Sequence, residues 1–261
     1  MILFYHKHRN VILPLMVIPI VLVIWELYII IFKVPNYLLP DPYNFFLAMI
    51  EFFKTGDMFY HIWVTLKEIF IGTFWGILIG ITLGYVLAKV EFLEKLVMPF
   101  VIIVQTAPKI SLAPLFILWM GLGIESKVAL VILVVSFPVM TNEVLAVRSI
   151  EKNIYDLMKI LKGNAWQRFF KIEMPFSGEM LISGMKLAVT QAMIGAVIGE
   201  MIGAKAGLGY LVVLGGENYN INLILSAVIL LSLLGLILYE LFDVLEKKIL
   251  SWKDITTEVI G

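Results

Sequence analysis

Six stretches of about 20 mainly apolar residues follow one another along this chain, and a helix needs about that many to cross a bilayer. The chain is 61% hydrophobic and 15% charged, whereas soluble domains are roughly half apolar and a quarter charged. We therefore predict an all-α membrane protein with about six transmembrane helices. The predicted spans are residues 11–32, 69–88, 96–120, 128–147, 182–203 and 223–245.

The first predicted span resembles the apolar part of a signal peptide, because Lys7 and Arg9 precede it. It is longer than such a segment, and no A-x-A cleavage site follows it. We therefore expect this span to be retained as a membrane helix.

The distribution of basic residues predicts which side of the membrane each connection faces. One set of alternate connections, together with both termini, carries 13 Lys and Arg residues, and the other set carries 5. Basic residues accumulate on the cytoplasmic side. We therefore expect a multi-pass protein of the plasma or inner membrane with both termini in the cytoplasm. The outer set is Lys33, Lys54, Lys67, Lys127 and Lys205.

The residue types exclude several kinds of site. The chain has no cysteine, which excludes thiolate metal sites and cysteine nucleophiles, and its three histidines lack metal-ligand spacing. It also lacks the G-x-x-x-x-G-K-[ST] loop that holds nucleotide phosphates. We expect no catalytic, cofactor-binding or metal-binding residue in this chain, and membrane lipid but no nucleic acid among its partners.

The connection after the first span predicts a short helix at the outer membrane surface, about residues 41–57. Asp41 can cap this helix, and Pro42 can occupy its first position. Large apolar residues recur in it at helical spacing, namely Phe45, Phe46, Met49, Phe52 and Phe53. An anchoring role is favoured over a ligand site.

Glycines recur at every fourth position in two of the spans. The second span contains Gly72, Gly76, Gly80 and Gly84, and the fifth contains Gly195, Gly199 and Gly203. Such stripes of small residues allow helices in lipid to approach closely. Packing within one subunit, a contact between two subunits and a moving contact are all compatible with them.

Polar residues within the spans are candidates for a translocation pathway. The third span is broken at "TAPKISLAP", and broken backbone at membrane depth is tolerated where it is buried in protein or lines a cavity. Ionisable residues in spans are costly in lipid, so they pair inside the bundle or line a pathway. The pathway candidates are Gln105, Lys109, Ser111, Lys186, Gln191 and Glu200. For Glu200, structural pairing and a pathway role are both open.

One long basic segment, "DLMKILKGNAWQRFFKIEMP", interrupts the apolar chain between the fourth and fifth spans. Apolar residues recur at helical spacing from Ile154, and Gly163 and Asn164 then supply a turn. A second helical piece begins near Ala165 and is predicted to end before Pro175. This element can lie on anionic lipid, cover the ends of the spans, or dock into a groove on a soluble partner.

The same segment, about residues 150–176, resembles the EAA loop of ABC importer permeases. That pattern is roughly E-A-A, three residues, G, nine residues, I, one residue and L-P. Counted back from Pro175, the E position falls on Asp156, the I position on Ile172 and the L position on Met174.

Two parts of the EAA pattern differ in this chain. Leu157 and Met158 replace the two alanines, and Lys162 occupies the glycine position with Gly163 one residue later. Other segments resemble the nitrate, sulfonate, taurine and bicarbonate branch of these permeases, so that the resemblance covers about residues 38–214. These segments are "LPDPYNFFLAMIEFFKTGDM", "PKISLAPLFILWMGLGIESK" and "GMKLAVTQAMIGAVIGEMIGAKAGLGYLV".

The resemblance implies a fold and a set of partners. The fold would be that of a type I ABC importer permease, with one domain over 1–261, a core over 60–250 and a coupling helix between spans four and five. Such permeases work in pairs, and we expect a homodimer here. Their other partners are a cytoplasmic ATPase dimer, which binds the ATP, and an extracytoplasmic binding protein. The chain itself would be no enzyme. Its cargo would be a small solute, nitrate-, sulfonate- or taurine-like or a heterocyclic vitamin or precursor.

The resemblance also assigns residues to the contact with the ATPase. Apolar residues of the first loop helix would fill a cleft, while charged ones would make rim contacts. The expected coupling residues are Asp156, Leu157, Met158, Lys159, Leu161, Lys162, Gly163, Trp166 and Pro175.

Two other classes of function compete with this interpretation. An ion-gradient-driven secondary transporter could use Glu200 and Lys186, and the EAA-like loop argues against it. An intramembrane enzyme would need acid, base or nucleophile groups within reach of one another, and the spans offer only Glu26, Lys109, Lys186 and Glu200.

Overall fold

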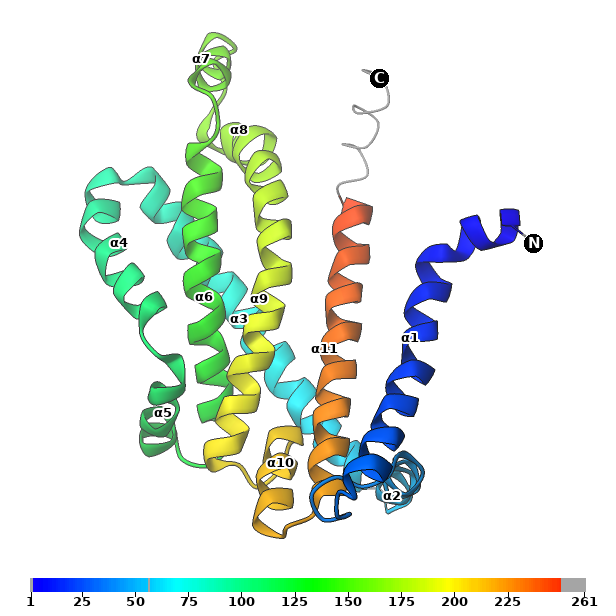
Figure 1. Cartoon of the computed structure of the whole chain (residues 1–261). Helices are drawn as coiled ribbons and strands as arrows, with labels where there is room; N and C mark the ends of the chain where they lie inside the picture. The colour runs from blue at the N-terminus through cyan, green and yellow to red at the C-terminus, as the bar shows by residue number, and fades with distance from the viewer. Residues whose placement is uncertain (1, 56, 250–261) are drawn as a thin grey trace.

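The computed structural model describes residues 2–55 and 57–249, with side chains from residue 17 onward except at 110, 179, 183 and 249 (Figure 1). Residues 250–261, and with them Lys253 of the predicted cytoplasmic charges, lie outside the described residues. Every regular element of the described part is helical, which confirms the predicted all-α class. The elements are α1 (Ile2–Phe32), α2 (Pro42–Lys54), α3 (Asp57–Lys89), α4 (Glu91–Thr106), η1 (Lys109–Leu112), α5 (Ala113–Met120), α6 (Ile124–Arg148), α7 (Lys152–Ile160), α8 (Ala165–Arg168), η2 (Phe169–Glu173), α9 (Met174–Gly203), α10 (Leu208–Glu217) and α11 (Ile221–Ile249).

All six predicted spans fall on helical segments. Among the described residues, four segments are long and apolar enough to cross a membrane: Asp57–Lys89, Ile124–Arg148, Met180–Glu217 and Ile221–Lys248. The first predicted span lies within α1, whose described side chains form the shorter apolar stretch Val17–Phe32.

The third predicted span is divided, as Pro108 and Pro114 suggest. Helix α4 ends at Thr106, one 3-10 turn follows, and α5 begins at Ala113 with Pro114 in its first turn. The break falls there because a proline lacks the amide that would continue the helix, and it restricts the residue before it to extended backbone. Ala107, which precedes Pro108, accordingly has a ψ of 143°.

Helix α6 lies at the centre of the bundle because both glycine stripes pack against it. A methyl group added at Gly76 of α3 would lie 2.8 Å from the side chain of Val135, and one added at Gly195 of α9 would lie 2.8 Å from that of Val134. These distances are too short for any side chain, so the glycines allow the three backbones to meet. The stripes therefore serve packing within one subunit.

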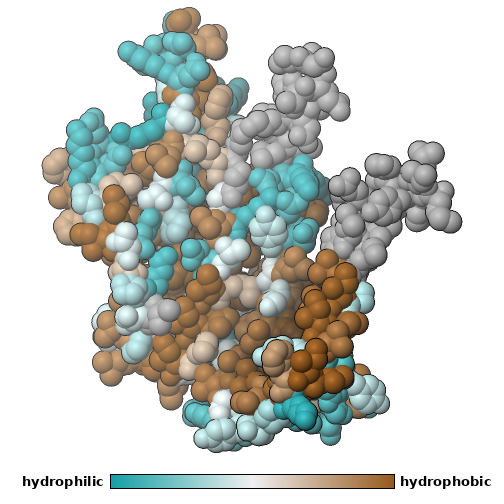
Figure 2. Space-filling model, in the orientation of Figure 1, coloured by the Kyte–Doolittle hydropathy of each residue, from teal (hydrophilic) through white to brown (hydrophobic). Residues whose placement is uncertain are grey.

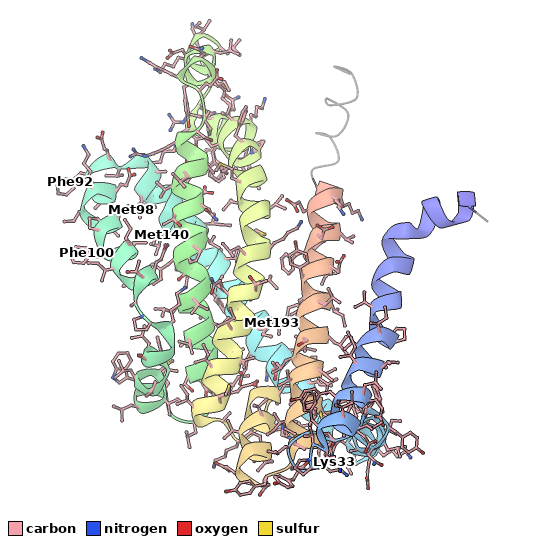
Figure 3. All side chains as sticks on the ribbon, viewed as in Figure 1. Lys33, Phe92, Met98, Phe100, Met140 and Met193 are labelled. Atoms are coloured by element: carbon pink, nitrogen blue, oxygen red, sulfur yellow. The ribbon has the colours of Figure 1, made fainter. Side chains whose placement is uncertain are left out.

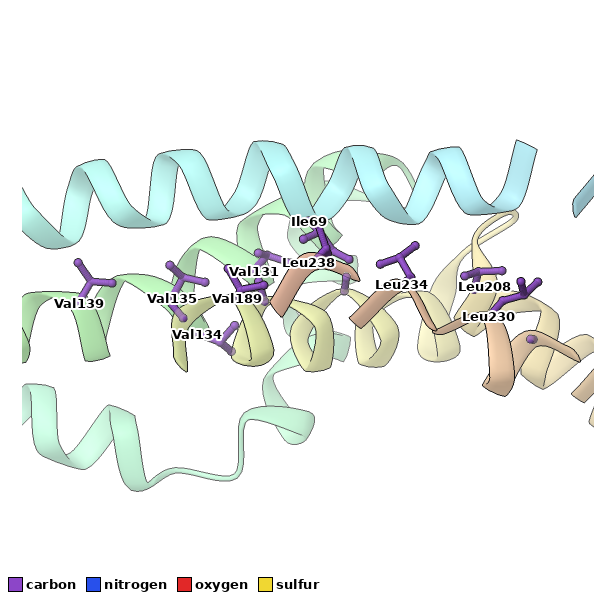
Figure 4. Packing of buried hydrophobic residues seen from close by; sticks show 14 of the residues in the cluster. Ile69, Val131, Val134, Val135, Val139, Val189, Leu208, Leu230, Leu234 and Leu238 are labelled. Carbon is purple, nitrogen blue, oxygen red and sulfur yellow. The ribbon is translucent and has the colours of Figure 1, made fainter. Parts of the chain in front are cut away.

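The main apolar core fills the space where α3, α6, α9 and α11 meet. Figure 4 shows Val131 and Val135 of α6 near Val189 of α9, with Leu238 of α11 and Ile69 of α3 beside them. A smaller cluster joins the ends of α3 and α6 to α4, where Met98 packs against the group that contains Met140 (Figure 3).

The two ends of the molecule differ in what they carry. In Figure 1 the start of α1, the end of α11 and the α7–α8 region lie at one end, while α2 and α10 lie at the other. Figure 2 shows hydrophilic residues over α7 and along the opposite rim, with hydrophobic residues between them. The predicted surface helix is α2, and Asp41 caps it as expected by accepting a 2.9 Å hydrogen bond from the Asn44 amide.

Candidate functional site

Helix α7 stands clear of the bundle at the tip of the loop between α6 and α9. None of its residues is buried. Leu157, Ile160 and the following Leu161 are 55%, 77% and 67% exposed. Asp156 and Lys159 form an ion pair of 3.0 Å along the helix. The helix therefore presents apolar side chains to its surroundings, with charged residues beside them.

A tight turn ends α7 at the position where the EAA pattern has glycine. Lys162 adopts a φ of +55°, the left-handed conformation that glycine adopts without cost. The Lys162 amide donates to the Lys159 carbonyl at 3.0 Å, and the Gly163 amide donates to the Met158 carbonyl at 2.9 Å. This pair of bonds is the Schellman motif, so the turn keeps its form although lysine replaces glycine.

Helix α8 begins directly after this turn with a capping box. The Asn164 side chain accepts from the Gln167 amide at 2.8 Å, and the Gln167 side chain accepts from the Asn164 amide at 2.9 Å. Trp166 stacks on Phe170, with ring centroids 5.3 Å apart, and remains 71% exposed. Phe169 instead meets the Tyr85 ring of α3 edge-on at 5.1 Å.

The second helical piece does not end before Pro175, so the sequence-based prediction of its end is wrong. One π-helical turn, η2, runs from Phe169 to Glu173, and α9 continues from Met174 with Pro175 in its first turn. In this turn the Met174 amide donates to the Phe169 carbonyl, one residue farther back than in an α-helix. The missing amide of a proline is tolerated in a first helical turn, so the helix runs on.

Glu173, which sequence reasoning did not single out, is the most connected side chain of this region. It is 1% exposed and accepts a 2.7 Å hydrogen bond from the Tyr85 hydroxyl. Its other oxygen pairs with Lys89 and lies 3.1 Å from the Arg168 Nε. Burial alone would raise the pKa of Glu173, but the hydrogen bonds from Lys89 and Tyr85 outweigh burial and hold this pKa below its usual value.

Tyr155 brings α7 to the same carboxylate. Tyr155 is half-buried, and this partial burial, followed by the Glu173 charge, raises the pKa of Tyr155 to about 12. The Lys89 ammonium lies 5.4 Å from the centre of the Tyr155 ring and 5.3 Å from that of Tyr85. One acidic group therefore holds residues of α3, α7 and α8 together.

The polar residues of the broken third span lie apart from this loop. Gln105 of α4 donates to the Thr141 hydroxyl of α6 at 3.4 Å. Lys109 is half-buried in η1, and Ser111 is exposed. Gln191 is half-buried on α9. The structure does not join these four residues in one cluster.

Lys186 is held by carboxylates of this same chain. Its ammonium pairs with Asp243 and Glu246 of α11, and Lys247 lies 2.6 Å from Asp243 on the other side. These pairs join α9 to α11. The positive charge of Lys186 is thus already matched by internal groups.

Glu200 fixes the turn between α9 and α10. It is 1% exposed and accepts 2.6 Å hydrogen bonds from the Thr65 hydroxyl and from the Gly209 amide. The Thr65 hydroxyl in turn accepts from the Leu208 amide at 2.8 Å. Lys186 and Glu200 are 14 residues apart on one helix, roughly 21 Å, so they cannot act on one reacting group.

Lys127, assigned from the sequence to an outer connection, is a buried residue of α6. It is 1% exposed and donates to the carbonyls of Leu122 and Gly203. Gly199 lies against its side chain. An ammonium here satisfies carbonyls at helix and loop ends that would otherwise lack a donor.

The family comparison connects this geometry with known proteins. Residues 76–251 match the family described as "Binding-protein-dependent transport system inner membrane component". The chain belongs to this family. It is therefore a permease component of an ABC importer, in a membrane and built from multiple apolar helices.

Three curated relatives place the permease among importers with different named cargoes. It is 32% identical to the formylaminopyrimidine transport permease ThiX of Halalkalibacterium halodurans, over 92% of this chain and 95% of the relative. It is 31% identical to the riboflavin permease RibX of Chloroflexus aurantiacus, over 90% and 87%. It is 24% identical to the putative aliphatic sulfonates permease SsuC of Bacillus subtilis, over 90% and 85%.

Solved structures share the fold of the permease. An inward-facing structure of the MetNI methionine ABC transporter superimposes with a TM-score of 0.66 and 18% identity, covering 75% of this chain and 97% of that one. The predicted type I importer architecture, with a helical loop before the fifth predicted span, is thus confirmed at the level of fold. The cluster of Glu173 with Tyr85, Lys89 and Arg168, called the Glu173 cluster below, could have been suspected from the sequence. Glu173 is the single acidic residue between Lys162 and Pro175, close to Arg168 and Lys171.

Proposed function

We propose that two copies of this permease form the pathway of an ATP-driven importer and that a cytoplasmic ATPase dimer docks on α7. The observation that carries the proposal is the exposed apolar face of Leu157, Ile160 and Leu161 on a helix that buries none of its residues. A helix with such a face is stable in a hydrophobic groove of a partner, which hides its apolar residues from water.

Each predicted coupling residue has a role that its surroundings support. Leu157 and Leu161, with Ile160, would enter the groove, and Asp156 and Lys159 would set its register from the rim.

The remaining predicted coupling residues would shape the loop. Met158 lies half-buried against Gly163, and Lys162 forms the turn that follows α7. Trp166 stacks on the loop surface, and Pro175 starts α9. These five residues, Gly163 included, would act through the shape of the loop more than through direct contact.

Transport would follow from two packings of the helices. ATP favours the closed ATPase dimer, and the differential affinity of ATP for that state would shift the permease between outward- and inward-open populations. The loop is joined to α6 and to α9 through the backbone, so movement of α7 would reach both helices. No covalent change of the solute is needed.

The arrangement of the ends supports the orientation predicted from the charges. The start of α1 and the end of α11 lie at the α7 end of the molecule, so docking of an ATPase there would place both termini in the cytoplasm (Figure 1). The binding protein would then meet the opposite end, where α2 and α10 lie. On this proposal the whole chain, 1–261, is one permease domain with its core over 60–250.

A small solute delivered by the binding protein is the proposed cargo. The relatives at 32% and 31% identity are named for formylaminopyrimidine and riboflavin, while that at 24% is named for sulfonates. This order supports a flat heterocyclic vitamin or precursor over a sulfonate. Gln105, Lys109, Ser111 and Gln191 remain the predicted pathway residues, whereas the pairing of Lys186 and the hydrogen bonds of Glu200 support structural roles for these two.

Capture of the partner tests this proposal. The tagged full-length chain is purified in detergent from its own cells, and its companions are identified by mass spectrometry. Wild type and the control Lys152→Asp, which adds an exposed carboxylate to the same helix, should retain a P-loop ATPase. Leu157→Asp with Ile160→Asp should lose it. A wild-type chain that transports solute without any ATPase would instead support a gradient-driven transporter.

A further inference from the structure

The route by which motion of the α7–α8 loop reaches α3 is not given by the chain connectivity. Helices α6 and α9 continue from the two ends of the loop through the backbone, but α3 ends at Lys89, far from the loop in sequence. Movement of the loop can reach α3 indirectly, through the packing of α3 on α6, or directly, through side-chain contacts between the loop and α3.

The polar contacts between the loop and α3 converge on Glu173, beside the ring contact of Phe169 with Tyr85. Its buried carboxylate accepts from Tyr85 and pairs with Lys89, which are one turn apart on the last turns of α3. The same carboxylate pairs with Arg168 of α8 and faces Tyr155 of α7. Three loop segments and α3 therefore share one anion.

The π-helical turn puts Glu173 in this position. Residues Phe169–Glu173 wind by one extra residue per turn, so Glu173 lies on the buried side together with Ile172. Such turns are uncommon and occur frequently at functional positions, because they rotate the side chains that follow. Here the turn lies at the junction of the loop with α9.

The energetics make this contact a stiff one. A buried carboxylate that loses its partners leaves an uncompensated charge, so the cluster resists separation of its members more strongly than an exposed ion pair would. Stiff contacts of this kind allow a displacement to pass between helices as a rigid-body movement.

We propose that Glu173 is a positioning residue that joins α3 to the α7–α8 loop, so that displacement of the loop moves α3 together with α6 and α9. This inference rests on the proposed function, because it requires an ATPase that moves α7. It adds that coupling depends on a side chain that lies beside the docking surface and has no contact with the ATPase.

Reconstituted complexes of the full chain with its ATPase and binding protein provide the test. Glu173→Gln keeps the shape of the side chain and removes its charge. We expect assembly and basal ATP hydrolysis to persist, while stimulation by the loaded binding protein falls roughly fivefold or more, the range of typical coupling energies. The matched control is Glu94→Gln, which removes an ion pair to Arg148 between α4 and α6 at the same end of the molecule.

Lys89 provides a second set of variants in case the Glu173 variant does not accumulate. Lys89→Gln should lower the stimulation as Glu173→Gln does, and Lys89→Arg should restore it, because arginine keeps the charge. A residue needed only for folding would not separate stimulated from basal hydrolysis in this way. Equal loss in Lys89→Arg and Lys89→Gln would contradict the proposed role of charge.

A distance measurement reports on the joint movement directly. The sequence has no cysteine, so spin labels can be placed at Lys67→Cys on α3 and Lys152→Cys on α7, both exposed. ATP binding should leave the distribution of distances between the labels unchanged in wild type. In Glu173→Gln, ATP binding should shift or broaden this distribution. Full stimulation and an unchanged distance in Glu173→Gln would overturn the inference alone, whereas a wild-type chain that recruits no ATPase would overturn the proposed function and this inference with it.

Discussion

The Gly163 amide donates a 2.9 Å hydrogen bond to the Met158 carbonyl, and this bond closes the turn that holds Lys162 at a φ of +55°. The turn decides how α7 is presented, because α8 begins only two residues after Gly163. The geometry that the EAA pattern obtains with glycine is therefore kept here with lysine, at some cost in backbone strain.

Replacing Lys162 with glycine should relieve that strain. We expect Lys162→Gly to stabilise the turn by about 1 kcal/mol, since L-residues are disfavoured in the left-handed region by roughly that amount. Slower amide exchange of Gly163 would report the gain. Lys159→Gly, within α7, should instead speed exchange, and faster exchange in Lys162→Gly would contradict the strain.

The contact between α3 and α6 should not tolerate a methyl group. A Cβ at Gly80 would lie 2.7 Å from the backbone carbonyl of Ser136. We expect Gly80→Ala to lower the free energy of unfolding by about 1–3 kcal/mol, as overpacking does. Thermal unfolding in detergent measures the change.

Gly216 is the matched control for Gly80, because a Cβ there would meet no atom within 4 Å. Gly216→Ala should raise stability by about 0.5–1 kcal/mol, since alanine loses less backbone entropy in a helix. Equal effects of the two substitutions would mean that the α3–α6 contact is looser than described.

Loss of the Glu200 carboxylate should release the turn before α10. Glu200→Ala leaves the buried Gly209 amide without its acceptor, whereas Thr65 can still donate to the His61 carbonyl at 3.2 Å. We expect a loss of about 1–3 kcal/mol, the cost of an unsatisfied buried donor. Thermal unfolding measures this loss, with Thr190→Ala, a substitution at an exposed position on the same helix, as the control. Equal stability of Glu200→Ala and Thr190→Ala would contradict the structural role of Glu200.

The Glu173 cluster should make the free energy of unfolding depend on pH in the acidic range. The pKa of Glu173 in the folded protein lies below its usual value of 4.5, so the folded state binds this proton less tightly than the unfolded state. The contribution is fully present above pH 4.5 and is lost as the pH falls through the folded pKa. Unfolding measured from pH 7 downward should therefore show a steeper loss in wild type than in Glu173→Gln, and parallel curves would contradict this assignment.

The sequence predicts the helices well because lipid requires long apolar runs. Five of the six predicted spans lie within one helical segment each, and the third is divided between α4 and α5. The cap at Asp41 and the break near Pro108 follow from local backbone chemistry and were likewise predictable. The sequence did not predict which helices the glycine stripes join, because a stripe of small residues fits any close neighbour.

The roles of charged residues were harder to predict, because they depend on partners distant in sequence. Lys186 finds its two carboxylates on α11, and Glu173 finds Tyr85 and Lys89 on α3. The burial of Lys127 was unpredictable for the same reason. The sequence places this residue in a connection before a span, whereas the fold buries it against the end of α9. The effect of Pro175 was misjudged because this proline lies in the first turn of α9, directly after the π-turn, where the missing amide is tolerated.

On the proposed function, the exposed face of α7 couples ATP hydrolysis in the partner ATPase to movement of the membrane helices. Solute uptake by vesicles that contain the chain, its ATPase and its binding protein tests it most directly, with Leu157→Asp and Ile160→Asp together compared with Lys152→Asp. We expect uptake to be abolished in the double variant and kept in the control, with both chains folded to the same extent. ATP-dependent uptake by the double variant at the wild-type rate would contradict it.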